Sequence, residues 1–301
     1  MKAGTVVALC VLVVLWASAF PAIKLGLEGL SPLHLTLARH LVASAAFAVF
    51  LLVSRARLLP RRGDVPALLG LGLIGITVYH VSLNVGQLQV SAGATSLIIA
   101  TAPALTALIA FFVLHDALGP LGWLGTAFGL AGVALIVLGD GSQRLAPSLG
   151  PYAALVLLAA LATACFAVFQ RPLLRRYRPL ELTAYVTWAG TLPMLLFFSG
   201  FDVALAGAGQ RSLLAALHLG VFPSAVAYTL FAFALSRAPA TLVTAWLYLI
   251  PGFALLFSWW WLGEVPSALT VAGGAVVVGG VAMVNLSKRR QRAPVSPAAV
   301  G

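Results

Sequence analysis

The stretch GTAFGLAGVA at residues 125–134 recurs as GGAVVVGGVA at residues 273–282. The leading glycines and the Gly-Val-Ala triplets fall in one register, with residue 125 matching residue 273. The same offset relates Pro103 to Pro251, Leu114 to Leu262 and Asp116 to Glu264, and an offset shorter by one relates Pro32-Leu33, Leu35 and Thr36 to Pro179-Leu180, Leu182 and Thr183. Because proline, acid and glycine recur in the same order, the pattern indicates an internal duplication.

The composition is that of a membrane protein. Hydrophobic residues make up 61% of the 301 positions and charged residues 8%, against about 45–50% and about 25% in soluble domains. A spanning helix needs about 20 apolar residues, so ten would occupy most of the chain. The net charge of +11 reflects only seven acids. Since the bases sit between apolar runs, we read this charge as a topology signal and expect no nucleic-acid partner.

Ten apolar runs have spanning length, and turn or breaker residues separate them. They cover residues 4–24, 33–53, 66–87, 92–114, 118–139, 151–171, 181–200, 213–235, 240–262 and 267–286. Pro32, Pro66, Pro120, Pro151, Pro179, Pro239 and Pro266 stand at or beside the boundaries. We therefore predict an all-α membrane protein of ten transmembrane helices embedded in a lipid bilayer.

The basic residues predict the orientation, because short cytoplasmic loops are enriched in lysine and arginine. With the N-terminus inside, the outer loops hold Arg144 and Arg211. The inner side receives Lys2, Arg55, Arg57, Arg61, Arg62, Arg171, Arg175, Arg176, Arg178, Arg237, Lys288, Arg289, Arg290 and Arg292. Both termini are thus expected in the cytoplasm, in a bacterial-type inner (plasma) membrane.

The duplication divides the chain into a first repeat at residues 1–140 and a second at 150–286, followed by a basic cytoplasmic tail at 287–301 that we expect to be disordered. Five helices in each copy make the second enter the membrane from the opposite side. Inverted repeats of this kind are a recurring transporter design.

Several motifs resemble a known family. They are Trp16-Ala17-Ser18 with Lys24, Ser31-Pro32-Leu33 leading to Arg39, Ala102-Pro103, and Tyr248-Leu249-Ile250-Pro251 through Leu262-Gly263-Glu264. Over residues 4 to 286 the sequence is similar to EamA-type members of the drug/metabolite transporter superfamily, with an amino-acid or metabolite exporter character. His115-Asp116 departs from that family's Gly-Glu. The resemblance implies ten helices with both ends cytoplasmic, and export or exchange of amino acids, nucleosides, sugars or drug-like metabolites.

His80 is the main candidate for the substrate site. It lies near the middle of the run 66–87, where an ionisable group is costly and has no short route to the interface. Tyr79 and Asn84 add polar groups beside it, and the repeat maps His80 onto Tyr228. The two residues are predicted to flank one midplane site, although hydrogen bonding to a neighbouring helix would also account for a buried histidine.

Other polar and aromatic residues follow helical spacing and complete the predicted site, with packing as the alternative for each stripe. These are Trp16, Phe20, Ser96, Thr163, Phe166, Gln170, Thr244, Trp246 and Tyr248. Lys24 and Arg39 are candidates for a gating or charge role, with snorkelling to the interface as the alternative. His80 and His218 are the groups expected to titrate near neutral pH within the helices, so proton coupling and exchange both stay open.

An intramembrane enzyme and a channel are the rival classes. An enzyme needs a nucleophile with a base, a metal cluster or paired carboxylates, and the sequence contains no Gly-x-Ser-x-Gly and no acid near the middle of an apolar run. We expect no cofactor and no metal, because the five histidines are scattered and Cys10 and Cys165 lie in apolar runs. Glycines such as Gly125 and Gly129 permit close helix packing within a monomer, with a dimer face as the alternative.

Overall fold

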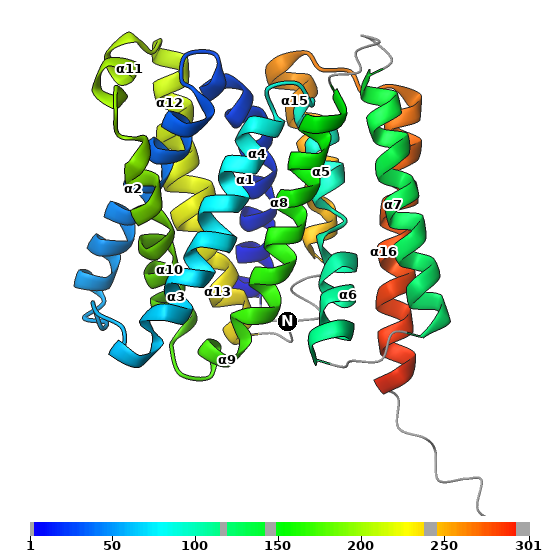
Figure 1. Cartoon of the computed structure of the whole chain (residues 1–301), viewed down its shortest axis with the longest axis horizontal. Helices are drawn as coiled ribbons and strands as arrows, with labels where there is room; N and C mark the ends of the chain where they lie inside the picture. The colour runs from blue at the N-terminus through cyan, green and yellow to red at the C-terminus, as the bar shows by residue number, and fades with distance from the viewer. Residues whose placement is uncertain (1–2, 115–118, 142–148, 238–245, 293–301) are drawn as a thin grey trace, which may run out of the picture.

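The computed structural model describes residues 3–114, 119–141, 149–237 and 246–292, and these residues form helices joined by short connections (Figure 1). Seven helices are long and apolar enough to cross a membrane, and shorter apolar helices cover Ala92–Thr106, Ile250–Leu262 and Ala268–Val284. The chain is therefore an all-α protein with at least seven candidate spans among the described residues.

The first half contains α1 (Ala3–Leu27), α2 (Pro32–Val53), the 3-10 turn η1 (Arg62–Asp64), α3 (Val65–Gly72), the π-helical segment η2 (Leu73–Val78), α4 (Tyr79–Gly86), α5 (Ala92–Ile99), α6 (Ala102–Leu114) and α7 (Pro120–Gly141). The second half contains α8 (Leu149–Phe169), α9 (Arg171–Leu174), α10 (Pro179–Met194), η3 (Leu195–Phe197), α11 (Phe201–Gly207), α12 (Gln210–Leu219), the π-helical segment η4 (Gly220–Val226), α13 (Ala227–Arg237), η5 (Leu247–Leu249), α15 (Ile250–Leu262) and α16 (Ala268–Arg292).

Local signals set several helix ends. The side chain of Ser31 caps α2 by accepting a hydrogen bond from the His34 amide at 3.2 Å, and Pro32 occupies the first turn, where its missing N–H costs nothing. Ser91 caps α5 in the same way through the Ala94 amide. α15 ends at Gly263, whose φ of 68° is left-handed and suits glycine.

The structure corrects three expectations about the helices. The run 92–114 is interrupted at Ala100 and Thr101, where the Thr101 hydroxyl bonds to the Ile98 carbonyl. A short helix, α11, lies within the connection between the runs ending at residue 200 and starting at residue 213. The tail prediction was wrong for residues 287–292, because α16 continues through Arg292; residues 293–301 lie outside the described part.

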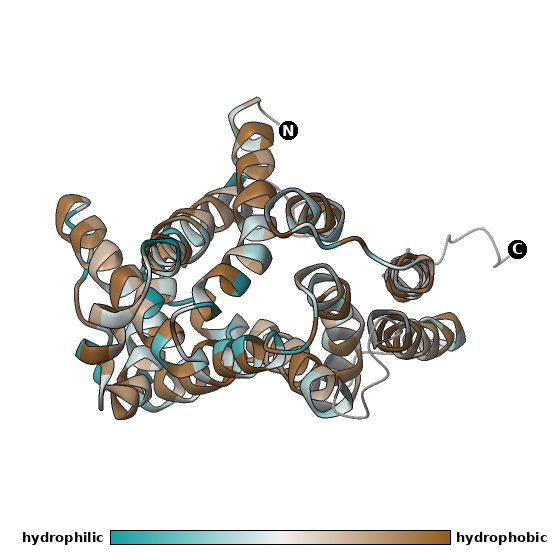
Figure 2. Ribbon diagram, turned by 90° about the horizontal axis from the view of Figure 1, so that it is seen from above, coloured by the Kyte–Doolittle hydropathy of each residue, from teal (hydrophilic) through white to brown (hydrophobic). Residues whose placement is uncertain are grey.

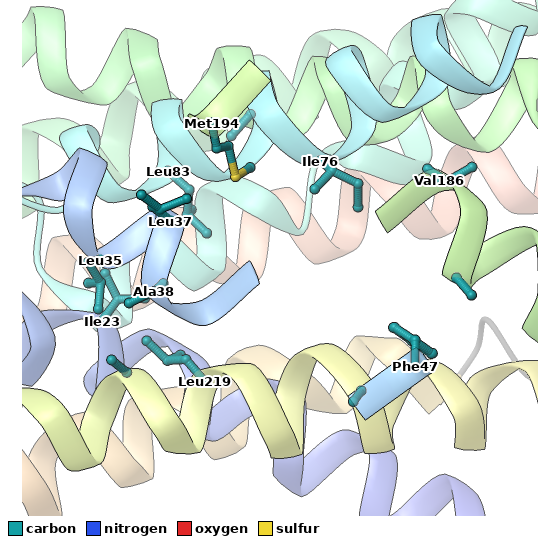
Figure 3. Packing of buried hydrophobic residues seen from close by; sticks show 14 of the residues in the cluster. Ile23, Leu35, Leu37, Ala38, Phe47, Ile76, Leu83, Val186, Met194 and Leu219 are labelled. Atoms are coloured by element: carbon teal, nitrogen blue, oxygen red, sulfur yellow. The ribbon is translucent and has the colours of Figure 1, made fainter. Parts of the chain in front are cut away.

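The hydrophobic pattern is that of a protein surrounded by lipid. Figure 2, seen from above, shows mostly hydrophobic residues on the outer faces of the helices. Large apolar side chains are exposed there, such as Leu196 at 83% and Trp260 at 71%. The main apolar cluster lies between the helices of the two halves, with Ile23, Leu37, Ile76, Leu83, Val186, Met194 and Leu219 among its members (Figure 3). The residues named here come from α1, α2, η2, α4, α10 and α12.

Helices α7 and α16 lie side by side at one edge of the molecule (Figures 1 and 2). A Cβ added to Gly125 would meet the backbone of Gly280, and one added to Gly132 would lie 2.8 Å from the carbonyl oxygen of Gly273. A later residue of α7 contacts an earlier residue of α16, so the two helices are antiparallel. This assigns the repeated glycine stretch to packing within the chain.

Glycines also allow close packing between the halves near the centre. A Cβ added to Gly72 would lie 2.5 Å from the Gly190 nitrogen, and one added to Gly220 would lie 2.7 Å from the Arg39 carbonyl oxygen. Gly72 ends α3 and Gly220 opens η4, so each contact adjoins a π-helical segment.

Candidate functional site

The two π-helical segments occupy corresponding positions in the halves. η2 spans Leu73–Val78 and is followed by Tyr79 and His80, while η4 spans Gly220–Val226 and is followed within two residues by Tyr228. A π-helical turn changes which face of a helix its following residues present, and such turns are frequent at functional sites. Here they precede the tyrosine and histidine that the sequence singles out.

Arg39 of α2 lies at the centre of a buried polar cluster, which we define as Arg39, His40, Tyr79, His80 and Ser224. Arg39 is only 3% exposed. Its Nε and Nη2 atoms both donate to the hydroxyl of Ser224 in η4, at 3.3 and 3.0 Å. Arg39 therefore does not snorkel to an interface, and it joins α2 of the first half to η4 of the second.

Two buried histidines lie against each other in this cluster. The ring centroids of His40 and His80 are 4.3 Å apart in an edge-to-face arrangement. His40 Nδ1 lies 2.9 Å from the Thr36 carbonyl and His80 Nδ1 lies 2.8 Å from the Ile76 carbonyl. Because a carbonyl oxygen only accepts, each Nδ1 carries a proton, and Nε2 is the acceptor when the ring is neutral.

Amide side chains continue the polar surface along α4 toward its C-terminal end. Asn84 Nδ2 donates to the Thr36 hydroxyl at 2.7 Å, and Gln87 Nε2 donates to the Phe20 carbonyl at 3.3 Å. Both side chains are fully buried. Their oxygens, Asn84 Oδ1 and Gln87 Oε1, have no hydrogen-bond donor within the described structure.

Aromatic side chains cover one side of the polar cluster. The Trp16 ring lies 5.3 Å from the rings of both Tyr228 and Phe231, and its Nε1 donates to the Pro223 carbonyl at 3.0 Å. Trp246 packs in the same apolar group. Tyr228 also interacts electrostatically with Arg39, so an aromatic wall and a buried cation share this region.

Most of the predicted site residues in the first half converge here. His80, Tyr79 and Asn84 belong to one buried region with Arg39, and Phe20 supplies a backbone acceptor to it. Phe166 of α8 packs against the same core, close to Gly75 of η2. The ring of His80 packs on Tyr79, whereas the ring of Tyr228 packs on Trp16, so the two predicted residues have different aromatic neighbours.

Other predicted residues lie elsewhere. Ser96 is buried but bonds within its own helix, to the Gly93 carbonyl at 2.7 Å. Thr163 is half-buried on α8, and Gln170 directly precedes α9, the helix that Figure 1 shows at one end of the bundle. Lys24 lies half-buried in the last turn of α1. Thr244 and the side chain of Tyr248 lie outside the described residues.

The structure adds His40, Ser224 and Gln87, which sequence reasoning missed. The expectation that His80 and His218 are the groups within the helices that titrate near neutral pH left out His40, which is buried and follows Arg39 directly. Thr36 and His40 are four residues apart and so share a helix face. This spacing is the sequence signal by which His40 could have been found. His218 itself bonds to the Ser18 hydroxyl at 2.9 Å, between α12 and α1.

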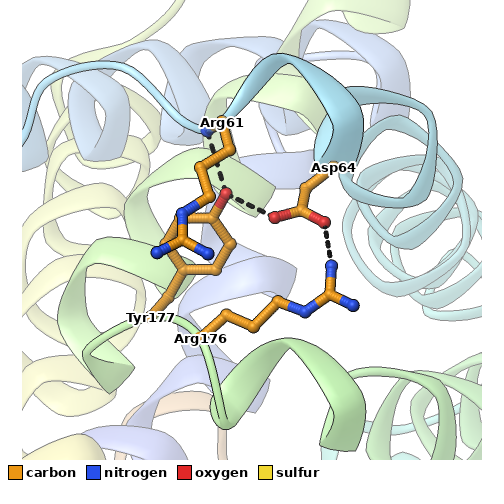
Figure 4. Close-up of polar contacts among 4 residues, drawn as sticks. All are labelled: Arg61, Asp64, Arg176 and Tyr177. Carbon is orange, nitrogen blue, oxygen red and sulfur yellow. Dashed lines mark hydrogen bonds and ion pairs between the residues drawn. The ribbon is translucent and has the colours of Figure 1, made fainter.

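A second polar network joins the halves at the end of the molecule that carries the basic loops (Figure 4). The Asp64 carboxylate pairs with Arg176 and accepts from the Tyr177 hydroxyl at 2.8 Å, and Tyr177 accepts from the Arg61 amide at 2.9 Å. Burial, reinforced by the bond to Asp64 and opposed by that from Arg61, raises the pKa of the Tyr177 phenol. We call these four residues the basic-end network.

The cavities near the surface are separate from the polar cluster. One of about 450 Å³ lies among α5, α15 and the segment leading to α16, beside Glu264, and another lies between α7 and α8. Neither is lined by Arg39 or His80. Among the described residues, no group of three or more His, Cys, Asp or Glu side chains is arranged to hold a metal ion. The buried polar cluster therefore offers hydrogen-bonding groups and one charged side chain, with aromatic rings beside them.

Comparison with known proteins identifies the family to which the chain belongs. Residues 4–138 and 150–286 each match the EamA-like transporter family. The protein belongs to this family of membrane transporters, within the drug/metabolite transporter superfamily, and is an integral membrane protein.

Two relatives are similar over nearly the whole chain. The uncharacterized transporter YdfC of Bacillus subtilis is 38% identical over 272 residues, covering 90% of this chain and 88% of that protein. A probable terminal-alkyne amino-acid exporter of Streptantibioticus cattleyicolor is 37% identical over 287 residues, covering 94% and 95%. A solved crystal structure has the same fold, with a TM-score of 0.66 at 20% identity, covering 97% of this chain and all of that one.

Proposed function

We propose that the protein exports or exchanges a small amphipathic metabolite across the inner membrane, by alternating access of two inverted five-helix repeats with both termini in the cytoplasm. The observation that carries this proposal is the buried polar cluster, which joins α2 of one half to η4 of the other beside an aromatic wall. Transporters built from repeats bind their substrates where the repeats meet. A channel or an intramembrane enzyme is the alternative class.

Reciprocal contacts support the inverted arrangement. Gly125 and Gly132 correspond to Gly273 and Gly280 in the repeat, and Gly125 packs on Gly280 while Gly132 packs on Gly273. Gly72 packs on Ala189, and its counterpart Gly220 packs on Val42, the counterpart of Ala189. A two-fold axis lying between the halves produces such exchanged pairs, and antiparallel α7 and α16 fit an axis in the membrane plane.

The position of the basic loops supports a cytoplasmic placement for one end. The segment around Arg61 and the segment around Arg176 meet in the basic-end network, so arginines from both halves gather on one side of the bundle. Positively charged short loops favour the cytoplasmic face.

The Streptantibioticus relative, named as a probable exporter of an amino acid, supports an amphipathic solute of that size. In this chain the neutral Nε2 of His80 and the phenols of Tyr79 and Tyr228 offer hydrogen bonds to a polar group. Trp16 and Phe231 offer apolar surface, which matches the division seen in small-molecule pockets.

The test is transport by the purified chain in proteoliposomes, over a panel of amino acids, nucleosides and aromatic drugs, using counterflow so that no driving force needs to be assumed. We expect at least one solute to be moved by the wild type, and His80→Ala and Tyr228→Phe to reduce that flux at least tenfold. Thermal stability in detergent should stay near that of the wild type.

The opposite pattern would assign His80 to packing. In that case His80→Ala would lower stability by about 1–3 kcal/mol, the cost of losing a buried hydrogen bond, and the folded fraction would transport normally. That result would remove the site and leave the transporter assignment in place.

A further inference from the structure

We propose that Arg39 binds the carboxylate of the transported solute, so that the substrate class is amphipathic carboxylates. This rests on the proposed transport function and adds to it the chemistry of the solute's head group.

The guanidinium of Arg39 has donors to spare. A guanidinium carries five N–H groups. Nε and Nη2, which form one edge of the guanidinium, both donate to a single acceptor, Ser224 Oγ. Nη1 is buried without any hydrogen-bond partner. The end-on edge formed by Nη1 and Nη2 is therefore still able to donate two parallel hydrogen bonds, which is the geometry that a carboxylate accepts.

No carboxylate of the described part of the protein neutralises this cation. Asp64 and Glu28 pair with arginines at the ends of the molecule, and Glu181 accepts from the Arg57 and Arg178 amides. The guanidinium is held instead by the neutral hydroxyl of Ser224. A buried charge is stable when it is paired. An anionic group of a bound solute would therefore form an ion pair with Arg39.

The surroundings favour a carboxylate over a larger or more highly charged anion. Arg39 is the one side chain of the cluster that always carries a charge, and the Nδ1–H groups of His40 and His80 are each used on a backbone carbonyl. A phosphate would need several cationic donors. Trp16 donates to the carbonyl of Pro223, the residue before the Ser224 that binds the guanidinium, and its ring packs on Tyr228. An apolar tail therefore has an aromatic surface near the bound head.

The experiment compares carboxylates with matched carboxamides, which keep the shape and remove the negative charge. Binding to the detergent-purified full chain is measured by tryptophan fluorescence for L-leucine and L-leucinamide, L-phenylalanine and L-phenylalaninamide, and 4-phenylbutanoate and 4-phenylbutanamide. For at least one pair we expect the acid to bind tenfold or more tightly than the amide, in the range of one hydrogen-bonded charge pair.

Three variants locate the effect. Arg39→Gln removes the charge and should abolish the preference for the acid. Arg39→Lys keeps the positive charge but lacks the two parallel N–H donors of the guanidinium, so it should retain a smaller preference for the acid. Ser224→Ala removes the acceptor that holds the guanidinium and should weaken acid binding severalfold, which keeps the test decisive even if Arg39→Gln does not fold. Arg211→Gln, at an exposed ion pair, is the matched control and should leave the preference unchanged.

The outcomes separate this inference from the transport function. If acids and amides bind equally, or if Ser224→Ala and Arg39→Lys both keep the full preference, the inference is wrong, while counterflow of any solute in the larger panel would still establish transport. If the wild type binds none of the six compounds, the inference also fails. If counterflow fails for every solute of the larger panel, the transport proposal itself is refuted.

Discussion

Replacing Gly72 by alanine should weaken the contact between the two halves beside the polar cluster. The added Cβ would lie 2.5 Å from the Gly190 nitrogen and 2.8 Å from both the carbonyl carbon and the Cβ of Ala189. The atoms it meets are mostly backbone, so no flexible side chain can turn away. Overpacking of this kind lowers the free energy of unfolding by about 1–3 kcal/mol. The higher helix propensity of alanine offsets about 0.5–1 kcal/mol of that loss.

Gly70→Ala is the matched control. Gly70 lies in the same helix, is exposed, and has nothing within 4 Å of an added Cβ. The propensity gain is common to both variants, so their difference isolates the steric cost of about 1–3 kcal/mol. Domains of 150–250 residues shift by about 2–4 °C per kcal/mol. We therefore expect the apparent melting temperature of Gly72→Ala in detergent to lie roughly 2–12 °C below that of Gly70→Ala.

Transport on the same two proteins shows whether this contact matters for function. Because η2 follows Gly72 directly and carries the chain to Tyr79 and His80, a displaced α3 should also reduce counterflow. Melting temperatures within about 1 °C of each other would mean that α3 and α10 do not pack as closely as described, and the reasoning from this contact would fail.

Three further predictions concern the basic end. Single cysteines at Leu58 and Leu174, in a cysteine-free background, should resist an impermeant maleimide in intact cells and react after permeabilisation; labelling of intact cells would overturn the cytoplasmic placement. Because burial raises the pKa of Tyr177, the folded state holds this proton longer than the unfolded chain does, so the stability it contributes is present below about pH 10 and falls as pH rises further. Tyr177→Phe should therefore lose stability less steeply than wild type between about pH 10 and 11, as read from melting temperatures, and equal slopes would exclude this role. Asp64→Asn should lower the melting temperature more than Arg176→Gln, because Asp64 is buried whereas the Arg176 side chain is 55% exposed and its ion pair is worth little; the reverse order would contradict this account.

The sequence predicted the helical class and most helix positions because apolar length and breaker residues are local signals. It also identified His80, with Tyr79 and Asn84 beside it, as polar groups in the middle of an apolar run; that these residues bind the substrate stays a prediction. It did not predict the break at Thr101, which depends on a side-chain hydroxyl bonding back to the Ile98 carbonyl, or the extension of α16 through its basic end.

The rest of the site depends on contacts between distant segments. Arg39 and Ser224 meet across the halves, and nothing in the local sequence of either residue indicates the other. Gln87 lies just beyond the last turn of α4, where residues are usually assigned to a loop, yet it is fully buried against the Phe20 carbonyl. The π-helical turns that orient Tyr79 and Tyr228 have no sequence signature beyond their shared position in the repeat.

The glycine contacts between α7 and α16 have the form of an isologous interface. In a two-fold homodimer, a residue i of one subunit touches residue j of the other while j of the first touches i of the second. Gly125 with Gly280 and Gly132 with Gly273 obey this rule within one polypeptide. Each half thus carries both sides of a self-complementary surface, and two separately expressed halves should be able to reassemble through it without their covalent connection.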